Sequence, residues 1–591
     1  MLGEITSIGD NTISVKLNIE KDKRSGIVNN HLIFTYNNDI IVGEVITIDN
    51  DCANVLLVGE INNNTFIPGT IKKPDLTSSI RLINDEELKL LIGIENNKSE
   101  EYFYLGKTNI YNNYPIYVKY NDFFSNHFSI FGNSGSGKSC SIARIIQNVF
   151  SKINPIAYKS NMIIFDVYGE YNTAFKDINK TYPNISSKIY TTDLNSSEHK
   201  LINIPFHLLG LDDIALLLDA TEPSQLPILK KALLLANIFN KVEEESIKYK
   251  NDIIARTIQQ ILYSGKSGSQ IRDQILAILS TYNTTELNAE TKISQPGYIR
   301  TFKQCLIVDS NGKINEMQLV GDFINQFIDD NLDYNTNIIN KSYSIQDFEM
   351  ALEFALISEG VLKSDKIYDL TNLLRVRLNS ISTSTSSKFF ECDNYISKEE
   401  YIRGLLTNFD GKKAQILNFN MNYVDDRFAK VLVKIYSKMF FDYCTSLKNR
   451  ATFPFHIVVE EAHRYIQNDN DTYLLGYNIF DRIAKEGRKY GVILGLISQR
   501  PSELSETAIS QCTNFLVLRM LHPKDLEYVE DMIPDITSEI TKKLKTLQKG
   551  CAIGFGSSFR IPVLIKFDLP NPMPQSTNCD IMSSWFVNLN K

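Results

Sequence analysis

Two different spacings of hydrophobic residues occur along the chain, and they divide it into regions. In residues 1–120, short segments rich in β-branched residues, such as Thr12–Leu17 and Ile40–Ile48, are separated by Asn, Asp and Gly clusters such as Asn62–Asn64. Such clusters form tight turns because these residues tolerate left-handed backbone conformations. Several short strands divided by turns predict a small β-barrel over residues 1–120.

A helical spacing replaces this pattern in residues 206–405. Apolar residues recur three and four positions apart in Pro227–Phe239, Gln270–Leu279 and Ile345–Leu356, which predicts amphipathic helices. The region contains no cluster of candidate ligands in its sequence. It is therefore predicted to be an inserted helical domain with a mechanical or interactive role.

Short, largely apolar runs flank that region on both sides. They are typical of parallel strands buried on both faces, and they alternate with helical segments as in α/β folds. The runs are His127–Phe131, Asn161–Phe165, Lys413–Phe419, His456–Val459 and Gly491–Ile497. We therefore expect an α/β core in two parts, residues 121–205 and 406–568. The proline-rich segment 569–591 is expected to be an extended tail that lies across a neighbouring molecule.

Composition narrows the class of protein. The 591 residues are 43% apolar, which suffices for sizeable cores in several domains. The net charge of -7 argues against a protein that coats nucleic acid with its outer surface, although a narrow channel needs only a few local cations. No signal peptide opens the chain, and no apolar stretch approaches the roughly 18 residues of a membrane span. We expect a cytoplasmic protein that does not enter a membrane.

One segment matches the phosphate-loop pattern G-x-x-x-x-G-K-[ST], and it lies between a predicted strand and a predicted helix. It consists of Gly132, Asn133, Ser134, Gly135, Ser136, Gly137, Lys138, Ser139 and Cys140. In such a loop, backbone N–H groups and the helix N-terminus surround the phosphates. Lys138 would reach the terminal phosphates and Ser139 would bind Mg²⁺. The flanking strand and helix disfavour a Gly/Ser turn that fits by chance, so we predict that the chain binds a nucleoside triphosphate.

Two acids follow the strand predicted at Asn161–Phe165. Ligands of open α/β sheets sit at the carboxyl ends of the strands, so Asp166 and Glu170 would lie near the triphosphate. A helix-capping Asp166 and a surface Glu170 explain the same pattern equally well.

A second pair of acids follows the strand predicted at His456–Val459. A short apolar strand that ends in two acids is a Walker B pattern, with Glu460 where Asp is commoner. Glu460 would hold the Mg²⁺ shell, and Glu461 would orient and deprotonate the attacking water. The pattern is weak evidence alone, but it becomes strong evidence downstream of a phosphate loop.

Polar residues near the last core strand complete the set of candidates. Gln499 follows Gly491–Ile497 and could sense the γ-phosphate. Arg482, Arg488 and Arg500 are candidates for a finger that reaches a neighbouring subunit's nucleotide. A surface ion pair is the competing interpretation of each arginine.

These segments together resemble HerA, a hexameric DNA-translocating ATPase of the FtsK/HerA branch of P-loop proteins. The motifs that carry the resemblance are GNSGSGKS at 132–139, FDVYGEY at 165–171, Glu222–Gln225, VVEEAHRYI at 458–466, RIAKEGRKYG at 482–491 and ISQRPSELS at 497–505. The resemblance implies an α/β fold with a RecA-like P-loop core, an N-terminal HAS-like β-barrel and an inserted helical domain.

The resemblance also implies roles for particular residues. Lys138 and Ser139 would hold phosphates and Mg²⁺, and Glu460 and Glu461 would form the Walker B pair. Gln499 would be the sensor. Arg488 is our choice for the finger that acts in trans, with Arg482 second.

ATP and Mg²⁺ are the implied cofactors. The implied assembly is a homo-hexamer around double-stranded DNA, working with a NurA-like nuclease or, in anti-phage defence, with a sirtuin-like or nuclease effector. Two functions fit these features. The first is a DNA translocase or helicase driven by ATP, and the second is an ATP-dependent hexameric platform that organises an effector with little or no translocation. The acidic net charge favours the platform, whereas Glu461, Gln499 and the arginines favour genuine turnover.

Overall fold

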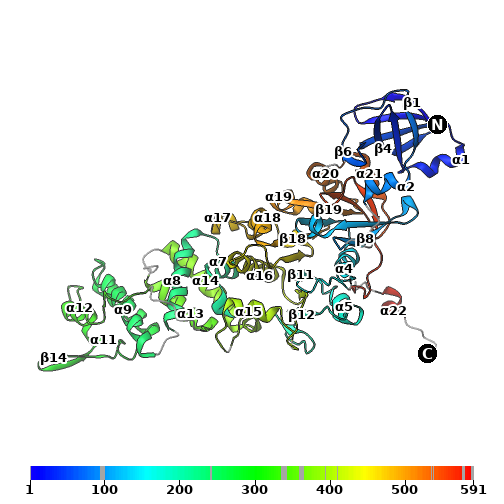
Figure 1. Ribbon diagram of the computed structural model, residues 1–591. Coiled ribbons are helices and arrows are strands. Elements are labelled where there is room, and N and C mark those ends of the chain that lie inside the picture. The colour runs from blue at the N-terminus through cyan, green and yellow to red at the C-terminus, as the bar shows by residue number, and fades with distance from the viewer. Residues whose placement is uncertain are drawn as a thin grey trace. The chain divides into compact units, whose positions relative to one another are not determined.

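The structure is a computed structural model, and it describes residues 2–93, 100–152, 154–239, 243–334, 342–358, 365–392, 394–408, 410–533, 536, 538–575 and 580–586. The chain divides into two compact units. The first unit comprises Met1–Leu201, Ile402–Asp469 and Asn478–Lys591, and the second comprises Ile202–Tyr401 and Asn470–Tyr477. By the colour bar of Figure 1, the green part of the ribbon belongs to the second unit.

The first unit begins with a seven-stranded antiparallel sheet in the order β1-β2-β5-β4-β3-β7, with β6 paired to β5. Its strands are β1 (Gly3–Ile8), β2 (Thr12–Leu17), β3 (His31–Tyr36), β4 (Asp39–Asp49), β5 (Cys52–Asn62), β6 (Thr65–Pro68) and β7 (Ser79–Leu82). Asn residues with left-handed backbone close several of its turns, among them Asn37, Asn50 and Asn63.

A closed barrel is not confirmed for this sheet. It is a half-barrel, because its edge strands β1 and β7 form no ladder, and the Leu2 N–H donates one hydrogen bond of 2.9 Å to the Ile80 carbonyl near these edges. Val15 and Val55 pack in the sheet's own core, whereas Ile33 and Val42 belong to the large core around the phosphate-loop strand. A sheet with apolar residues covered on both faces need not close to remove them from water.

A twelve-stranded mixed sheet forms the rest of the unit. Its order is β13-β12-β16-β11-β17-β18-β10-β19-β20-β21-β8-β9. Its strands are β8 (Tyr102–Thr108), β9 (Tyr114–Lys119), β10 (His127–Phe131), β11 (Met162–Asp166), β12 (Ser187–Thr191), β13 (Lys200–Leu201), β16 (Ile416–Asn420), β17 (Phe455–Val459), β18 (Val492–Ser498), β19 (Cys512–Leu518), β20 (Cys551–Gly556) and β21 (Val563–Lys566). Neighbours from β13 to β19 run parallel, and the ladders from β19 to β9 are antiparallel. The α/β core expected from the sequence is thus present.

Every residue of the central strands β10, β11, β17 and β18 is buried, which explains their nearly continuous apolar sequences. In the ladders, Phe131 at the end of β10 pairs with Ser498 of β18 and with Val517 of β19. The carboxyl ends of these strands therefore meet at one edge of the sheet, where open α/β folds place their ligands.

The second unit is inserted after an edge strand of the twelve-stranded sheet. The chain leaves the sheet after the edge strand β13 and returns as β16, which pairs with both β12 and β11. Ile416 is the partner of Ser187 on one side and of Met162 on the other. The central strands are therefore continuous despite the long insertion between them.

Helices cover the sheet of the first unit, and the helix after the phosphate loop is α4 (Lys138–Val149). The others include α2 (Asp85–Ile92), α3 (Tyr120–Phe124), α5 (Asn172–Phe175), α6 (Ile178–Thr181), α16 (Asp426–Ser446), α18 (Ile479–Tyr490), α19 (Glu506–Ser510), α20 (Pro523–Met532), α21 (Ser538–Thr546) and α22 (Ile581–Trp585). Helix α22 lies within the tail that was expected to be extended, and residues 576–579 and 587–591 of that tail lie outside the described residues.

The second unit is built mainly from helices, and it contains a hairpin formed by β14 (Lys292–Gln295) and β15 (Tyr298–Thr301). Its helices include α7 (Leu211–Leu217), α8 (Leu226–Phe239), α9 (Glu243–Leu262), α10 (Gly268–Thr281), α11 (Phe302–Cys305), α12 (Met317–Asn325), α13 (Ile345–Ser358), α14 (Asp365–Thr383) and α17 (Asp471–Leu475), and α15 (Lys398–Leu405) spans the boundary. Helices α8, α10 and α13 confirm the three amphipathic helices predicted from the sequence. No helix in the described ranges combines the length and apolarity needed to cross a bilayer.

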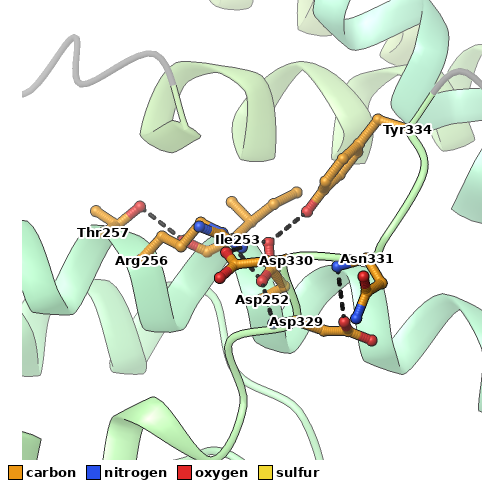
Figure 2. Close-up of polar contacts among 8 residues, drawn as sticks. All are labelled: Asp252, Ile253, Arg256, Thr257, Asp329, Asp330, Asn331 and Tyr334. Atoms are coloured by element: carbon orange, nitrogen blue, oxygen red, sulfur yellow. Dashed lines mark hydrogen bonds and ion pairs between the residues drawn. The ribbon is translucent and has the colours of Figure 1, made fainter.

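A buried carboxylate organises one end of the second unit (Figure 2). Asp252 on α9 is fully buried and accepts hydrogen bonds from the Asp329 N–H at 2.9 Å and the Tyr334 hydroxyl at 2.7 Å. It also accepts two from the Arg256 Nε, at 3.0 and 2.9 Å. Asp330, which is 88% exposed, pairs with another nitrogen of Arg256 at 2.9 Å. Asp252 therefore ties the 329–334 segment to α9.

We predict that Asp252→Ala destabilises the second unit, because it leaves the buried donors of Asp329 and Tyr334 and part of the Arg256 guanidinium unpaired. The expected loss is about 3 kcal/mol of unfolding free energy. Scanning calorimetry should record a lower transition midpoint for Asp252→Ala and almost none of this change for Asp330→Ala, whose ion pair is exposed. Equal shifts for the two variants would contradict the role given to Asp252.

Candidate functional site

The phosphate loop joins β10 to α4, and glycines set its conformation. Gly135 and Gly137 have φ values of 73° and 105°, a region that disfavours residues with a side chain. A Cβ atom at Gly137 would also lie 3.1 Å from the Gly550 nitrogen. The loop therefore requires glycine at position 137 for both backbone and packing reasons.

Neighbouring strand ends hold the loop in place. The Gly132 N–H donates to the Ser498 carbonyl at 3.2 Å, and the Asn133 N–H donates to the Arg519 carbonyl at 2.9 Å. The Gly550 N–H donates to the Ser136 carbonyl at 2.8 Å. The ends of β18 and β19 and the turn before β20 thus fix a loop that would otherwise be flexible.

The loop lysine folds back onto the loop itself. Lys138 Nζ donates to the Gly132 carbonyl at 2.8 Å and to the Asn133 carbonyl at 3.3 Å. Burial lowers the pKa of Lys138, and the carboxylates of Glu461 and Glu460 act in the opposite direction. An ammonium group that donates to carbonyl oxygens in a buried site can exchange these contacts for phosphate oxygens.

The structure brings Ser139 and Glu460 together although they lie 321 positions apart. The Ser139 hydroxyl donates to Glu460 Oε1 at 3.4 Å. The other oxygen, Glu460 Oε2, is buried without a hydrogen-bond partner among the described residues, as is Ser136 Oγ in the loop. A hydroxyl and a carboxylate with a spare oxygen are the hard donors that Mg²⁺ prefers, so these residues fit a magnesium ion.

Glu461 occupies a strained position beside the loop. Its φ of 44° is left-handed, which costs a non-glycine residue about 1 kcal/mol, and such strain clusters at functional sites. Burial raises the pKa of Glu461, while the charge of Lys138 and a hydrogen bond from the backbone of Gln499 oppose the rise. His463 Nδ1 lies 3.4 Å from Glu461 Oε2, and burial lowers the pKa of that histidine.

Asp166 and Glu170 occupy the turn after β11. Asp166 is fully buried and accepts hydrogen bonds from the Glu170 N–H at 3.1 Å, the Tyr171 N–H at 2.9 Å and Asn418 Nδ2 at 3.1 Å. It therefore caps the turn, and it also lies beside Glu460, since each carboxyl perturbs the other. Burial is the main cause that raises the pKa of both. Glu170 is half-buried, and its charge acts on Lys138.

Gln499 lies with the loop, whereas Arg500 points elsewhere. Gln499 directly follows β18, is half-buried and donates its N–H to Glu461. Arg500 is exposed and pairs with Glu503 at 2.7 Å, which is the surface ion pair that competed with a finger role.

Arg482 and Arg488 lie on α18, which runs back from the loop edge of the sheet toward the opposite edge. Gly491, just after the helix, hydrogen-bonds through its carbonyl to the N–H of Phe455, the first residue of β17. Arg488 is therefore separated from the loop edge by the length of β18, about 20 Å. The structure does not bring it to the phosphate loop of its own chain. Arg482 lies two turns earlier, exposed, with its guanidinium 5.2 Å from the Phe441 ring.

A buried histidine connects α18 to the phosphate-loop strand. His127 on β10 places Nε2 3.0 Å from the Ala484 carbonyl, and its Nδ1 accepts the Leu494 N–H at 2.9 Å. Burial lowers the pKa of His127 to about 4, so the ring is neutral at pH 7. The helix that carries the arginines is thereby fixed against the strand that carries the loop.

Two contributions to the site were missed by sequence reasoning. Arg519 follows β19 at the loop edge, and its Nε is buried without a hydrogen-bond partner among the described residues. The position of a cation directly after a core strand was a usable signal. Gln147 on α4 binds the tail at residues 571 and 572, and no local sequence signal indicates a contact over more than 420 positions.

Comparison with known proteins agrees with this geometry. The family model described as helicase HerA, central domain, matches residues 103–331. The probable DNA double-strand break repair helicase HerA of Methanocaldococcus jannaschii is 23% identical over 554 residues, which are 92% of this chain and 91% of the relative. HerA of Sulfolobus acidocaldarius, a DNA double-strand break repair helicase, is 25% identical over 506 residues, 85% of this chain and 76% of the relative.

Two solved structures align over much of the chain with low scores. VirB4 of Thermoanaerobacter pseudethanolicus has a TM-score of 0.41 and 12% identity, with 80% of this chain and 97% of that chain covered. The plasmid coupling protein TrwB in complex with ADP and Mg²⁺ has a TM-score of 0.39 and 13% identity, with coverage of 77% and 87%.

The sheet, the loop and the acids that follow the neighbouring strands define a P-loop ATPase. The sequence matches confirm the resemblance to the HerA family, and the chain is related to the HerA helicases over most of its length.

We predict that Glu461→Gly is more stable than Glu461→Ala by about 1 kcal/mol, because only glycine adopts the left-handed backbone at this position without cost. Both variants remove the same carboxylate, so they differ only by the Cβ methyl group that disfavours the left-handed backbone. Thermal unfolding of the two purified proteins measures this difference. Equal midpoints, or a lower midpoint for the glycine variant, would contradict the strain at position 461.

Proposed function

We propose that this chain is the motor subunit of a ring of six copies that hydrolyses ATP and moves double-stranded DNA through the centre of the ring. The observation that supports it is the convergence of Lys138, Ser139, Glu460 and Glu461 at one sheet edge. Arg488, near the end of α18, is separated from that edge by the length of β18, about 20 Å. One chain would thus supply the nucleotide-binding half of a site on one surface and a candidate for the completing half on another.

In this proposal the residues of the loop edge share the work of hydrolysis. Lys138 leaves the Gly132 and Asn133 carbonyls and contacts the terminal phosphates. Ser139 and Glu460 would hold Mg²⁺, and the ion would neutralise charge on the phosphates.

Glu461 is the proposed general base. It accepts a proton from the water that attacks the γ-phosphorus, and the products are ADP and inorganic phosphate. Burial raises the pKa of Glu461, which makes its carboxylate a stronger base than an exposed one. Gln499, which donates its N–H to Glu461, would report the presence of the γ-phosphate.

The proposal assigns the remaining positive charge to a second copy of the chain. Arg488 is exposed and lies far from its own phosphate loop, so it can contribute to hydrolysis only at a neighbour's site. Arg482 is the second candidate on the same helix.

The names of the relatives support a DNA substrate, and the HerA-like motifs of the sequence suggest the class of partner. The relatives named above are described as DNA double-strand break repair helicases. For this chain we propose a partner of the NurA-like nuclease class or a sirtuin-like or nuclease defence effector, bound to the same ring.

We predict that Arg488→Ala lowers ATP turnover about a thousandfold, the range of trans-acting arginine fingers. Mixing inactive Arg488→Ala with inactive Lys138→Ala should restore part of the activity, because some seams then combine an intact loop with an intact arginine. Phosphate release measured before and after mixing and reassembly tests this. Absence of recovery, with Arg482→Ala giving recovery instead, would move the role to Arg482.

We predict that double-stranded DNA stimulates ATP hydrolysis several-fold, since a motor couples turnover to movement along its track. The measurement compares steady-state phosphate release with and without linear duplex DNA at low salt. Glu461→Gln serves as a control that binds ATP but does not hydrolyse it. The same rate with and without DNA would contradict the motor and favour an ATP-dependent platform for an effector.

A further inference from the structure

The C-terminal tail of the chain is fixed to helix α4 and to the segment after β11 of its own unit. Residues 571–575, here called the tail strap, follow the last strand of the sheet. Just before them, Asp568 accepts a hydrogen bond from the Tyr104 hydroxyl at 2.8 Å, which anchors the start of the tail on β8. Pro570 and Pro574 are buried, although the tail lies outside the sheet.

One side chain of the phosphate-loop helix binds the strap in both directions. Gln147 on α4 is fully buried, its Oε1 accepts the Asn571 N–H at 2.8 Å, and its Nε2 donates to the Pro572 carbonyl at 2.8 Å. Both polar ends of the amide are thus satisfied by the tail backbone. A buried amide with no partner costs about 1–3 kcal/mol, so Gln147 and the strap depend on each other.

The same strap then contacts the turn that carries the second-strand acid. The Thr173 hydroxyl donates to the Met573 carbonyl at 2.9 Å, and the Gln575 N–H donates to the Glu170 carbonyl at 2.9 Å. On its other side the Glu170 N–H donates to Asp166. The peptide groups of Glu170 are therefore held between the sheet and the tail.

These contacts connect two parts of the nucleotide site. Helix α4 begins at Lys138 and reaches Gln147 nine residues later, a rise of about 14 Å along one rigid helix. The charge of Glu170 acts on Lys138, on Glu460 and on Glu461. The strap therefore contacts two elements, α4 and the Glu170 turn, that each also contribute to the nucleotide site.

We propose that Gln147 is a positioning residue of the nucleotide site, and that the tail strap couples the position of the C-terminal tail to nucleotide occupancy. The strap fixes the position of α4 relative to the Glu170 turn. Nucleotide binding requires Lys138 to leave the loop carbonyls, and we expect it to change the position of the tail that follows the strap. Because coupling between two sites is reciprocal, loss of the strap must also change nucleotide affinity. This inference rests on the proposed nucleotide binding at residues 132–140.

The chain supplies its own reporter for the test. Trp585 is the one tryptophan of the sequence, it lies in α22 ten residues after the strap, and it is 74% exposed. Its fluorescence and anisotropy therefore report on the tail. N-methylanthraniloyl-ADP with Mg²⁺ measures nucleotide affinity, and unlabelled ADP or a non-hydrolysable ATP analogue with Mg²⁺ is used for the Trp585 signal.

The variant is Gln147→Met, which keeps the length of the side chain and removes both hydrogen bonds. The matched control is Asn148→Leu, because Asn148 is equally buried on the same helix but donates to the Tyr104 carbonyl on β8 instead of the tail. We expect wild type and Asn148→Leu to show a nucleotide-dependent Trp585 signal. We expect Gln147→Met to lose that signal and to bind the labelled ADP about 2- to 10-fold more weakly, as the loss of a hydrogen-bonded contact implies.

The outcomes separate the strap from the nucleotide site. Wild type that binds the labelled ADP without any change at Trp585, or Gln147→Met that behaves like Asn148→Leu, overturns the strap and leaves the phosphate-loop assignment intact. Wild type that binds no labelled ADP overturns the proposed function itself. If Gln147→Met does not fold, a chain ending at residue 569 replaces it, and nucleotide affinity equal to that of wild type overturns the inference.

Discussion

The charges of three carboxylates act on a single ammonium group near the carboxyl ends of neighbouring parallel strands, and a fourth carboxyl lies beside one of them. Glu460, Glu461 and Glu170 all act on Lys138, and Asp166 lies beside Glu460. Burial of like charges is unfavourable, and it raises the pKa of both Glu460 and Glu461. This edge of the sheet therefore carries buried negative charge that its own side chains do not fully neutralise. A divalent cation with a polyphosphate supplies positive charge to the carboxylates and negative charge to the lysine and the loop N–H groups, which is the composition of magnesium ATP.

The parallel sheet is what makes this arrangement possible. Strands β10, β17 and β18 end at the same edge, so residues more than 300 positions apart in the sequence, such as Ser139 and Glu460, become neighbours. The second unit enters the chain at the edge strand β13 and leaves the central order of strands unchanged. His127 fixes α18 against the same sheet, through the Ala484 carbonyl of that helix and the Leu494 N–H of β18.

The part of the site that depends on short sequence patterns could be predicted, and the part that depends on long-range contacts could not. The loop at 132–140 and the acids at 460 and 461 follow strands whose apolar runs are visible in the sequence, and the structure brings Ser139 to Glu460. The N-terminal strands were also visible, but their number does not decide whether a barrel closes. That depends on apolar residues of both faces, such as Ile33, which packs in the main core.

The tail illustrates the same limit. Its prolines predicted an extended segment, and they did not reveal which surface would accept it. The structure places residues 571–575 on the chain's own α4 and on the Glu170 turn, through hydrogen bonds to the tail backbone. Backbone groups are the same at every position, so no sequence pattern marks them as partners. The cap formed by Asp166 was one of two interpretations of equal weight, and only the fold shows that one residue can both cap the turn and border Glu460.

The affinity of wild type and of Lys138→Ala for ATP, measured by titration calorimetry with and without Mg²⁺, tests the central claim most directly. The account predicts saturable, magnesium-dependent binding of ATP to the wild-type chain, weakened at least about tenfold in Lys138→Ala, because the buried ammonium group is the one side-chain cation placed in the loop. Equal affinity of the two proteins for ATP, or ATP binding that is the same with and without Mg²⁺, would contradict this account.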